Sequence, residues 1–199
     1  DYSLRQCLSE VRGTFHQTLV SKIRREGDKN KRDKLKSKLP CVTLSGVGNQ
    51  KIKDDIIEPV FKHSGLLQVD LDLDDHREWQ VDKMLEFVNN DKHVLASFLS
   101  PSGGVKAVVP IEQKKETHVN CFLHAEEHFA KAGLHMCKAT KNLQRLMYMS
   151  YDPHPYIADG EVEIFTPLEN ATQKHRSTEA QKQRNAETHQ NFSPFLSLI

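Results

Sequence analysis

A chain of 199 residues is long enough for one ordinary domain with a sizeable core, and a second full domain is not expected. It carries 28 lysines and arginines against 27 aspartates and glutamates, so the net charge indicates no class of partner and every electrostatic argument must be local. Four cysteines without CxxC spacing, no signal peptide and no apolar run of membrane-spanning length favour a reducing cytoplasm and no membrane partner.

The first part of the chain is predicted to be helical and then basic. Apolar residues recur at steps of three and four from Leu4 to about Arg25, which indicates a helix. Between Lys22 and Lys38 there are nine lysines and arginines against three acids. That stretch is either a solvated helix and turn or a surface for a nucleic-acid backbone. Residues 39–46, LPCVTLSG, are expected to form a strand that ends at a glycine turn.

The segment GLLQVDLDLDD, residues 65–75, is predicted to be a strand because apolar and acidic residues alternate in it. One face would carry the apolar residues Leu67, Val69 and Leu71, and the other face would carry Gln68, Asp70, Asp72 and Asp74. Carboxylates two residues apart on one face lie about 6–7 Å apart at their Cα atoms. Such groups repel each other, so a divalent cation is the natural occupant between them.

The rest of the chain predicts alternating helices and strands. We expect helices at residues 77–90 and 117–132 and strands at residues 145–151 and 161–167. Between the helices, residues 94–111 indicate two strands joined by a glycine-rich turn, Ser100–Gly104. This order favours an α+β domain over residues 1–166, with its sheet covered on one face and free for a ligand on the other. The polar residues 167–199 are expected to form a tail or a linker to a further region.

Two further segments carry polar groups suited to chemistry. In SPSGGVK, residues 100–106, glycine amides can approach an anion closely and Lys106 supplies a point charge suited to a phosphate. A plain hairpin with a surface lysine would have the same sequence pattern. In RLMYMSYDP, residues 145–153, a strand ends at Asp152 before a proline, a position where an aspartate is often only a turn residue.

Together the segments GLLQVDLD, SPSGGVK and RLMYMSYDP, preceded by LKSKLPCVTLSG, resemble the VirE N-terminal-like family of the archaeo-eukaryotic primase, or primase-polymerase, superfamily. The resemblance covers roughly residues 34–156. It implies a primase-polymerase-like catalytic fold with an RRM-like antiparallel or mixed sheet flanked by helices. Members typically belong to bacterial mobile genetic elements and prophages and are often joined to a helicase-like region, so a helicase domain or protein is an expected partner.

The resemblance also implies an activity and the residues that perform it. The activity is that of a DNA primase or polymerase, a nucleotidyltransferase of DNA replication that uses nucleoside triphosphates on a DNA template. The implied catalytic residues, which also bind Mg²⁺ or Mn²⁺, are Asp70, Asp72 and Asp152. The implied contacts to the nucleotide phosphates come from Ser100, Ser102, Gly103, Lys106 and Arg145. In such a two-metal reaction one ion activates the attacking 3′-hydroxyl and the other neutralises charge on the triphosphate.

Three alternatives remain open from the same residues. The SPSGGVK loop is shorter by one residue than is general in the family, and with the basic residues 22–38 this favours an inactive accessory protein that binds nucleic acid. A metal-dependent nuclease could use the same three carboxylates. Separately, His124 and His128 lie one helical turn apart with Cys121 nearby, a spacing that could bind zinc on a helix that also has a good core stripe.

Overall fold

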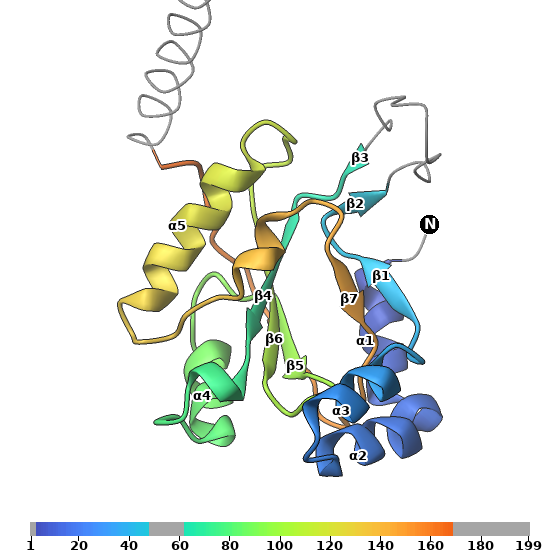
Figure 1. Ribbon diagram of the computed structural model, residues 1–199. Coiled ribbons are helices and arrows are strands. Elements are labelled where there is room, and N and C mark those ends of the chain that lie inside the picture. Colours follow the sequence, from blue (N-terminus) through green and yellow to red (C-terminus); the bar gives the residue numbers. More distant parts are fainter. Residues whose placement is uncertain (1–2, 48–61, 169–199) are drawn as a thin grey trace, which may run out of the picture.

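The computed structural model describes residues 3–47 and 62–168. Within them a four-stranded antiparallel sheet lies between helices, which confirms the predicted α+β fold class (Figure 1). Residues 169–199, which make up most of the predicted tail, lie outside the described residues. None of the helices in the described part combines the length and the apolar character needed to cross a membrane.

The central sheet has the strand order β4-β6-β5-β8. β4 (Leu66–Leu71) pairs with β6 (Val105–Pro110), and β6 pairs with β5 (Ala96–Leu99) in a hairpin. β8 (Tyr156–Ile157) adds an edge beside β5. The two predicted strands of the hairpin and the strand that carries Asp70 are therefore confirmed.

One face of this sheet is covered by α4 (Val81–Asn89) and α5 (His118–Ala130) (Figure 1). Each helix repeats its buried residues at steps of three or four, as an amphipathic helix requires. The core between helices and sheet includes Leu67, Val69, Leu71, Met84, Val88, Val105, Ala107, Val109, Phe122, Ala125 and Phe129. The predicted alternation of β4 is confirmed, because its three buried aliphatic residues share this face and Asp70 lies on the other.

The opposite face is also covered, which corrects the expectation of a free face. α1 (Leu4–Arg12) lies there beside a small antiparallel ladder of β1 (Cys41–Thr43) and β7 (Leu146–Tyr148) (Figure 1). The second core consists of Cys7, Leu8, Val11, Leu44, Ala96, Phe98, Val108, Met147 and Met149. The apolar side chains of Ala96, Phe98 and Val108 on this side of β5 and β6 need a cover, which α1, β1 and β7 provide among the described residues.

Several predicted elements are wrong in detail. The strand predicted over residues 65–75 ends at Leu71, so Asp74 lies in a 3₁₀ helix, and the strand predicted at 145–151 is limited to β7. The predicted N-terminal helix is interrupted at Gly13, whose amide caps α1 by donating to the carbonyls of Ser9 and Glu10. The predicted strand at 161–167 is reduced to one bridge between Phe165 and Ile111, and β8 takes the sheet edge instead. The remaining elements are η1 (Thr14–His16), α2 (Gln17–Arg25), α3 (Lys29–Lys36), β2 (Gly46–Val47), β3 (Lys62–His63), η2 (Leu73–Asp75) and η3 (Lys138–Lys141).

Candidate functional site

A pocket of about 80 Å³ opens at the end of the central sheet, where β4 stops and β5 turns into β6. Its lining includes six of the residues predicted from sequence, namely Asp70, Asp72, Ser100, Ser102, Lys106 and Arg145. The fold therefore brings together residues from three segments that are far apart in the chain. Gly103 belongs to the same turn but does not line the pocket, and Asp152 does not line it either.

Asp70 and Lys106 form a buried ion pair in this pocket. They are direct cross-strand partners in the ladder of β4 and β6, so strand register places their side chains on the same face. Lys106 Nζ lies 2.8 Å from Asp70 Oδ2, and the two side chains are only 8% and 13% exposed. The Gln68 side-chain amide donates to the same carboxylate oxygen at 3.4 Å. The pocket wall thus contains one positively and one negatively charged side chain, both largely shielded from water.

Asp72 follows β4, and a buried histidine holds its backbone. His76 accepts a hydrogen bond from the His135 amide at Nε2, 2.7 Å away, so the proton of the neutral ring is on Nδ1. That Nδ1–H donates to the Asp72 carbonyl at 2.6 Å. Sequence reasoning missed His76, because a histidine that fixes a backbone turn has no distinctive spacing.

The charges around Asp72 favour the binding of a cation. The pKa of Asp72 is raised above its usual value, mainly by burial and secondly by the negative charge of Asp70. The positive charges of Lys106 and Lys36 only partly offset this rise. Two carboxylates therefore lie close enough to repel each other, as the spacing in the sequence predicted. A divalent cation between them would remove this repulsion.

The turn between β5 and β6 contains two glycines, and each position requires glycine for a different structural reason. The Ser100 amide donates to the Gly104 carbonyl at 2.7 Å, and the Gly103 amide donates to the Ser100 carbonyl at 3.1 Å. Gly103 has a φ of +93°, a conformation that favours glycine. At Gly104 a Cβ atom would overlap the carbonyl oxygen of Leu71, directly before Asp72. The turn thus packs backbone to backbone against the segment that carries Asp72.

The hydroxyl of Ser100 is buried in the pocket wall without a hydrogen-bond partner among the described residues. Ser100 as a whole is 3% exposed. Buried polar groups are nearly always paired in folded proteins, so an unpaired one that lines a pocket is suited to a ligand or an ordered water. An oxygen-rich ligand such as a phosphate would accept a hydrogen bond from it.

Asp152 lies in a different environment from Asp70 and Asp72. It is 5% exposed, and both carboxylate oxygens accept backbone hydrogen bonds, Oδ2 from Leu99 at 2.8 Å and Oδ1 from His154 at 2.9 Å. Its own amide donates to the Val11 carbonyl at 3.0 Å. Asp152 thereby connects the end of β5 to α1 and to the segment after β7. Its predicted role as a metal ligand stays a prediction.

Two residues of the basic segment 22–38, Arg24 and Lys36, have different surroundings in the fold. Arg24 has a structural position, because its guanidinium donates to the carbonyls of Ser100 at 3.0 Å and Tyr151 at 2.8 Å. Burial is the main cause that lowers the Arg24 pKa below its usual value. Lys36 instead lines the pocket beside Asp72, although sequence reasoning did not single it out within the basic run.

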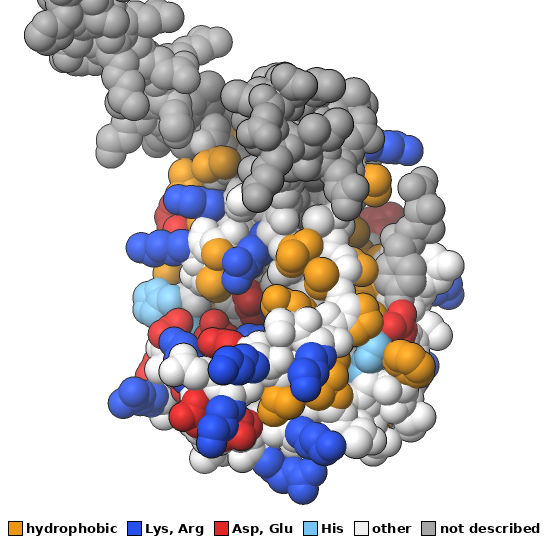
Figure 2. All heavy atoms as spheres, turned by 45° about the vertical axis from the view of Figure 1, so that its right-hand side comes forward, with side chains coloured by type: hydrophobic (Ala, Val, Ile, Leu, Met, Phe, Trp, Pro, Cys, Tyr) orange, Lys and Arg blue, Asp and Glu red, His pale blue; other side chains and the backbone are white. Residues whose placement is uncertain are grey.

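A second hollow of about 170 Å³ extends the pocket along α3. It shares Lys36, Asp72 and Ser102 with the first pocket and adds Lys29 and Arg32 from the same helix. Figure 2 shows lysine and arginine side chains, mixed with acidic ones, over the lower part of this side of the molecule. Asp33, Asp74 and Asp75 line this hollow as well, and Arg32 pairs with Asp74 at 3.2 Å, so the charges along it are mixed.

The comparisons with known proteins give one match. The model of the family described as BT4734-like, N-terminal domain, matches residues 34–157. This range contains every predicted site residue, the pocket and the strands of the central sheet. The comparison with curated proteins and the comparison with solved structures each gave no match.

Proposed function

We propose that this chain, which belongs to the BT4734-like N-terminal domain family, is a nucleotidyltransferase of the primase-polymerase type. The family is related to the VirE N-terminal and primase-polymerase type. In this proposal the protein acts in the cytoplasm on a DNA template during replication of a mobile element or prophage, with a helicase as partner. The observation that carries it is the pocket where Asp70 and Asp72 lie beside Lys106 and the unpaired hydroxyl of Ser100.

The donor atoms in the pocket fit a hard divalent cation. Asp70 and Asp72 supply carboxylate oxygens, which Mg²⁺ and Mn²⁺ prefer, and Mg²⁺ needs few protein ligands because it keeps waters and binds phosphate oxygens. Burial and the nearby negative charge of Asp70 raise the pKa of Asp72, and the positive charge of a bound cation would lower it and favour the ionised carboxylate. Such an ion, when bound, neutralises charge on a triphosphate and polarises it toward attack.

The other groups in the pocket fit the phosphates of a nucleotide. Lys106 is paired with Asp70, and its ammonium can turn to a phosphate oxygen when another cation offsets that carboxylate. Ser100 and Ser102 supply hydroxyl donors at the pocket wall. Arg145 and Lys36 add positive charge at the rim, so an anionic ligand would meet complementary charge as it enters.

Template-dependent incorporation of labelled nucleotides, measured with Mg²⁺ or Mn²⁺, tests this proposal. We expect activity from the wild-type chain and loss to background in Asp70→Asn and Asp72→Asn, because both carboxylates would hold the ion. Asp82→Asn is the matched control, since Asp82 is exposed in the first turn of α4 and does not line the pocket. Wild-type protein that binds Mn²⁺ and nucleotide but incorporates none would refute the polymerase activity.

A second candidate is an accessory protein that binds nucleic acid without catalysis, and the position of Asp152 favours it. The carboxylate of Asp152 is occupied by two backbone amides, so the pocket lining has two of the three carboxylates that the resemblance implies. Such a binder would lose affinity steeply as salt rises and would be indifferent to Asp72→Asn, which leaves the pair of Asp70 and Lys106 intact. Lys29→Glu and Arg32→Glu on α3 would weaken it. Degradation of labelled DNA without added nucleotides would instead indicate a nuclease.

A further inference from the structure

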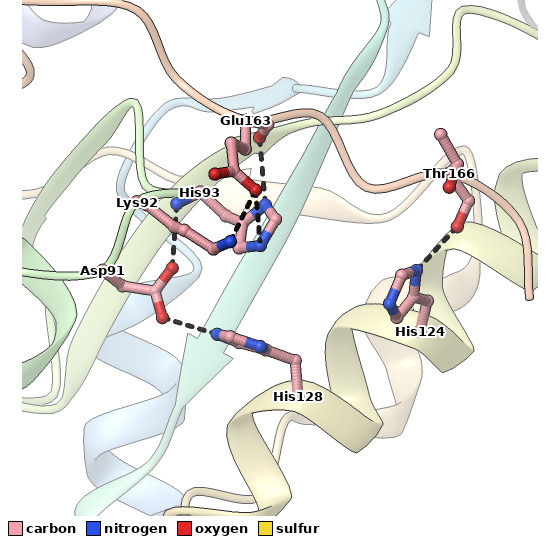
Figure 3. A network of polar contacts seen from close by, with 7 residues as sticks. All are labelled: Asp91, Lys92, His93, His124, His128, Glu163 and Thr166. Carbon is pink, nitrogen blue, oxygen red and sulfur yellow. Dashed lines mark hydrogen bonds and ion pairs between the residues drawn. The ribbon is translucent and has the colours of Figure 1, made fainter.

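A second group of polar side chains, which shares no residue with the pocket, joins the loop after α4 to α5 (Figure 3). Asp91 and His93 come from the loop and His128 comes from the helix. Each offers one ligand atom, and the three atoms all lie within 4.8 Å of one another. Figure 3 shows the Asp91 carboxylate pointing at the His128 ring, with His93 and Glu163 beside it.

The hydrogen bonds around this group orient His93 and Asp91 as in a metal site. His93 Nδ1 lies 3.1 Å from the Glu163 carbonyl oxygen, so in the neutral ring the proton is on Nδ1 and Nε2 is left with its lone pair. Metal-bound histidines usually donate their second N–H to a carbonyl or carboxylate in this way. Asp91 is fixed as well, because its Oδ1 accepts from the His93 amide at 2.9 Å.

The opposite oxygen of Asp91 is close to the second imidazole. Asp91 Oδ2 lies 2.6 Å from His128 Nε2, and the two side chains are 8% and 30% exposed. The Phe165 ring stacks on His93 with centroids 4.0 Å apart, so one side of the group is apolar. The partly exposed His128 leaves a route for an ion from solvent.

We propose that Asp91, His93 and His128 form a binding site for a divalent transition metal of the zinc class. Two imidazoles and one carboxylate are a ligand set that Zn²⁺ uses, with a fourth position open to water or another ligand. Glu163 is a candidate for that position, because its Oε2 lies 3.9 Å from His93 Nε2, although Lys92 now binds the same oxygen at 2.7 Å. The metal would replace the proton between Asp91 and His128.

This site differs from the zinc site that helical spacing suggested for Cys121, His124 and His128. His124 lies one turn from His128 on α5, but its Nδ1 donates to the Thr166 carbonyl at 2.8 Å (Figure 3). Cys121 is buried in the larger core, where burial raises the pKa of its thiol. Of the three residues in that set, only His128 belongs to the group proposed here. A bound ion would link the loop after α4 to α5 and to the chain near Phe165.

Calorimetric titration of the chelator-treated full chain with Zn²⁺, and absorption of the Co²⁺ form, test the proposal. We expect roughly one equivalent of Zn²⁺ to bind with micromolar or tighter affinity. His93→Gln and His128→Gln should each weaken this binding by at least about tenfold. His124→Gln is the matched control, because it removes a histidine from the same helix outside the group, and its affinity should equal that of the wild type.

A variant that does not fold would be recognised by its circular dichroism, and Asp91→Asn then serves as the second variant. The asparagine side chain has nearly the shape of aspartate. The variant should therefore bind Zn²⁺ more weakly, while the protein without metal keeps the helical circular dichroism spectrum of the wild type. The proposal is overturned if Zn²⁺ does not bind, or if it binds equally well to wild type, His93→Gln and His128→Gln. Neither result depends on nucleotide incorporation, so the site and the proposed function are tested separately.

Discussion

Asp70 and Lys106 are direct cross-strand partners whose charged groups meet at 2.8 Å in a buried part of the pocket. Buried ion pairs of this kind are weak contributors to stability as pairs, but each partner needs the other because an isolated charge there lacks water. Each charge of the pair therefore stabilises the buried position of the other while no ligand is bound.

Removal of Lys106 alone should strongly destabilise the protein. We expect Lys106→Met to lower the free energy of unfolding at neutral pH by about 3–5 kcal/mol, because it leaves the Asp70 carboxylate buried without its partner. Urea unfolding followed by circular dichroism measures the change. Asp70→Asn combined with Lys106→Met should regain much of the loss, since the double variant has no uncompensated charge.

Lys83→Met is the control for this cycle. Lys83 pairs with Glu86 on the exposed surface of α4, where such pairs contribute little. Equal destabilisation by Lys83→Met and Lys106→Met, or a double variant no more stable than Lys106→Met, would contradict the buried-pair account.

Gly104→Ala should disturb the pocket through the backbone. The added Cβ would overlap the Leu71 carbonyl and push the turn away from Asp72, at a cost of about 1–3 kcal/mol in unfolding free energy. Affinity for Mn²⁺ and nucleotide should fall as well, which calorimetry can measure. Gly160→Ala is the control, because no atom of the residues that the structure describes lies within 4 Å of a Cβ added there. An unchanged affinity in Gly104→Ala would show that the close packing does not position the site.

Asp72→Asn should stabilise the protein while it abolishes the proposed activity. Burial and the charge of Asp70 raise the pKa of Asp72, so the ionised form is less favourable in the folded protein than in the unfolded chain. Stability is therefore lost as pH rises through this pKa, and at neutral pH the neutral asparagine should raise the melting temperature by about 1–3 °C. Mn²⁺ should raise the melting temperature of the wild type but not of the variant. A lower melting temperature in Asp72→Asn would contradict this electrostatic account.

The buried pair of His63 and His118 predicts sensitivity to acid. Their ring nitrogens are 3.1 Å apart, and burial, with the charge of His63 as the second cause, lowers the pKa of His118 from 6.5 to about 4. Between these values the unfolded chain binds more protons than the folded protein, so stability is lost as pH falls. The loss from this group should reach about 2 kcal/mol near pH 5, measured by urea unfolding.

The variant His118→Phe should lose less stability than the wild type between pH 7 and about pH 5, because a phenyl ring does not titrate. His154→Phe is the comparison, since His154 is exposed. If wild type and His118→Phe respond equally to acid, the acid sensitivity has another origin.

Much of the central sheet could be predicted because its signals are local. Alternation of apolar and acidic residues identified β4, and two glycines between apolar runs identified the hairpin of β5 and β6. Most of the residues that line the pocket were implied by the family resemblance, and the pairing of β4 with β6 brings Asp70 and Lys106 together. The strand and the hairpin depend on residues close together in the chain, and sequence patterns report them well.

What escaped prediction depends on contacts between distant segments. The sequence predicted a strand that runs to Asp152, whereas β7 ends at Tyr148 and pairs with β1 outside the central sheet, which determines the neighbours of Asp152. His76 acts on a backbone carbonyl, and which carbonyl lacks a partner is known only from the fold. Helical spacing drew attention to His124 and His128, whereas Asp91 approaches His128 from another element.

The proposed function requires that Asp70 and Asp72 hold a divalent cation against a nucleoside triphosphate. A crystal of the chain grown with Mn²⁺ and a non-hydrolysable nucleoside triphosphate, measured for manganese anomalous scattering, tests it most directly. We predict an anomalous peak within coordination distance of both carboxylates, with phosphate density beside Ser100 and Lys106. No peak at this position, with the nucleotide absent from the pocket or bound elsewhere, would contradict the claim.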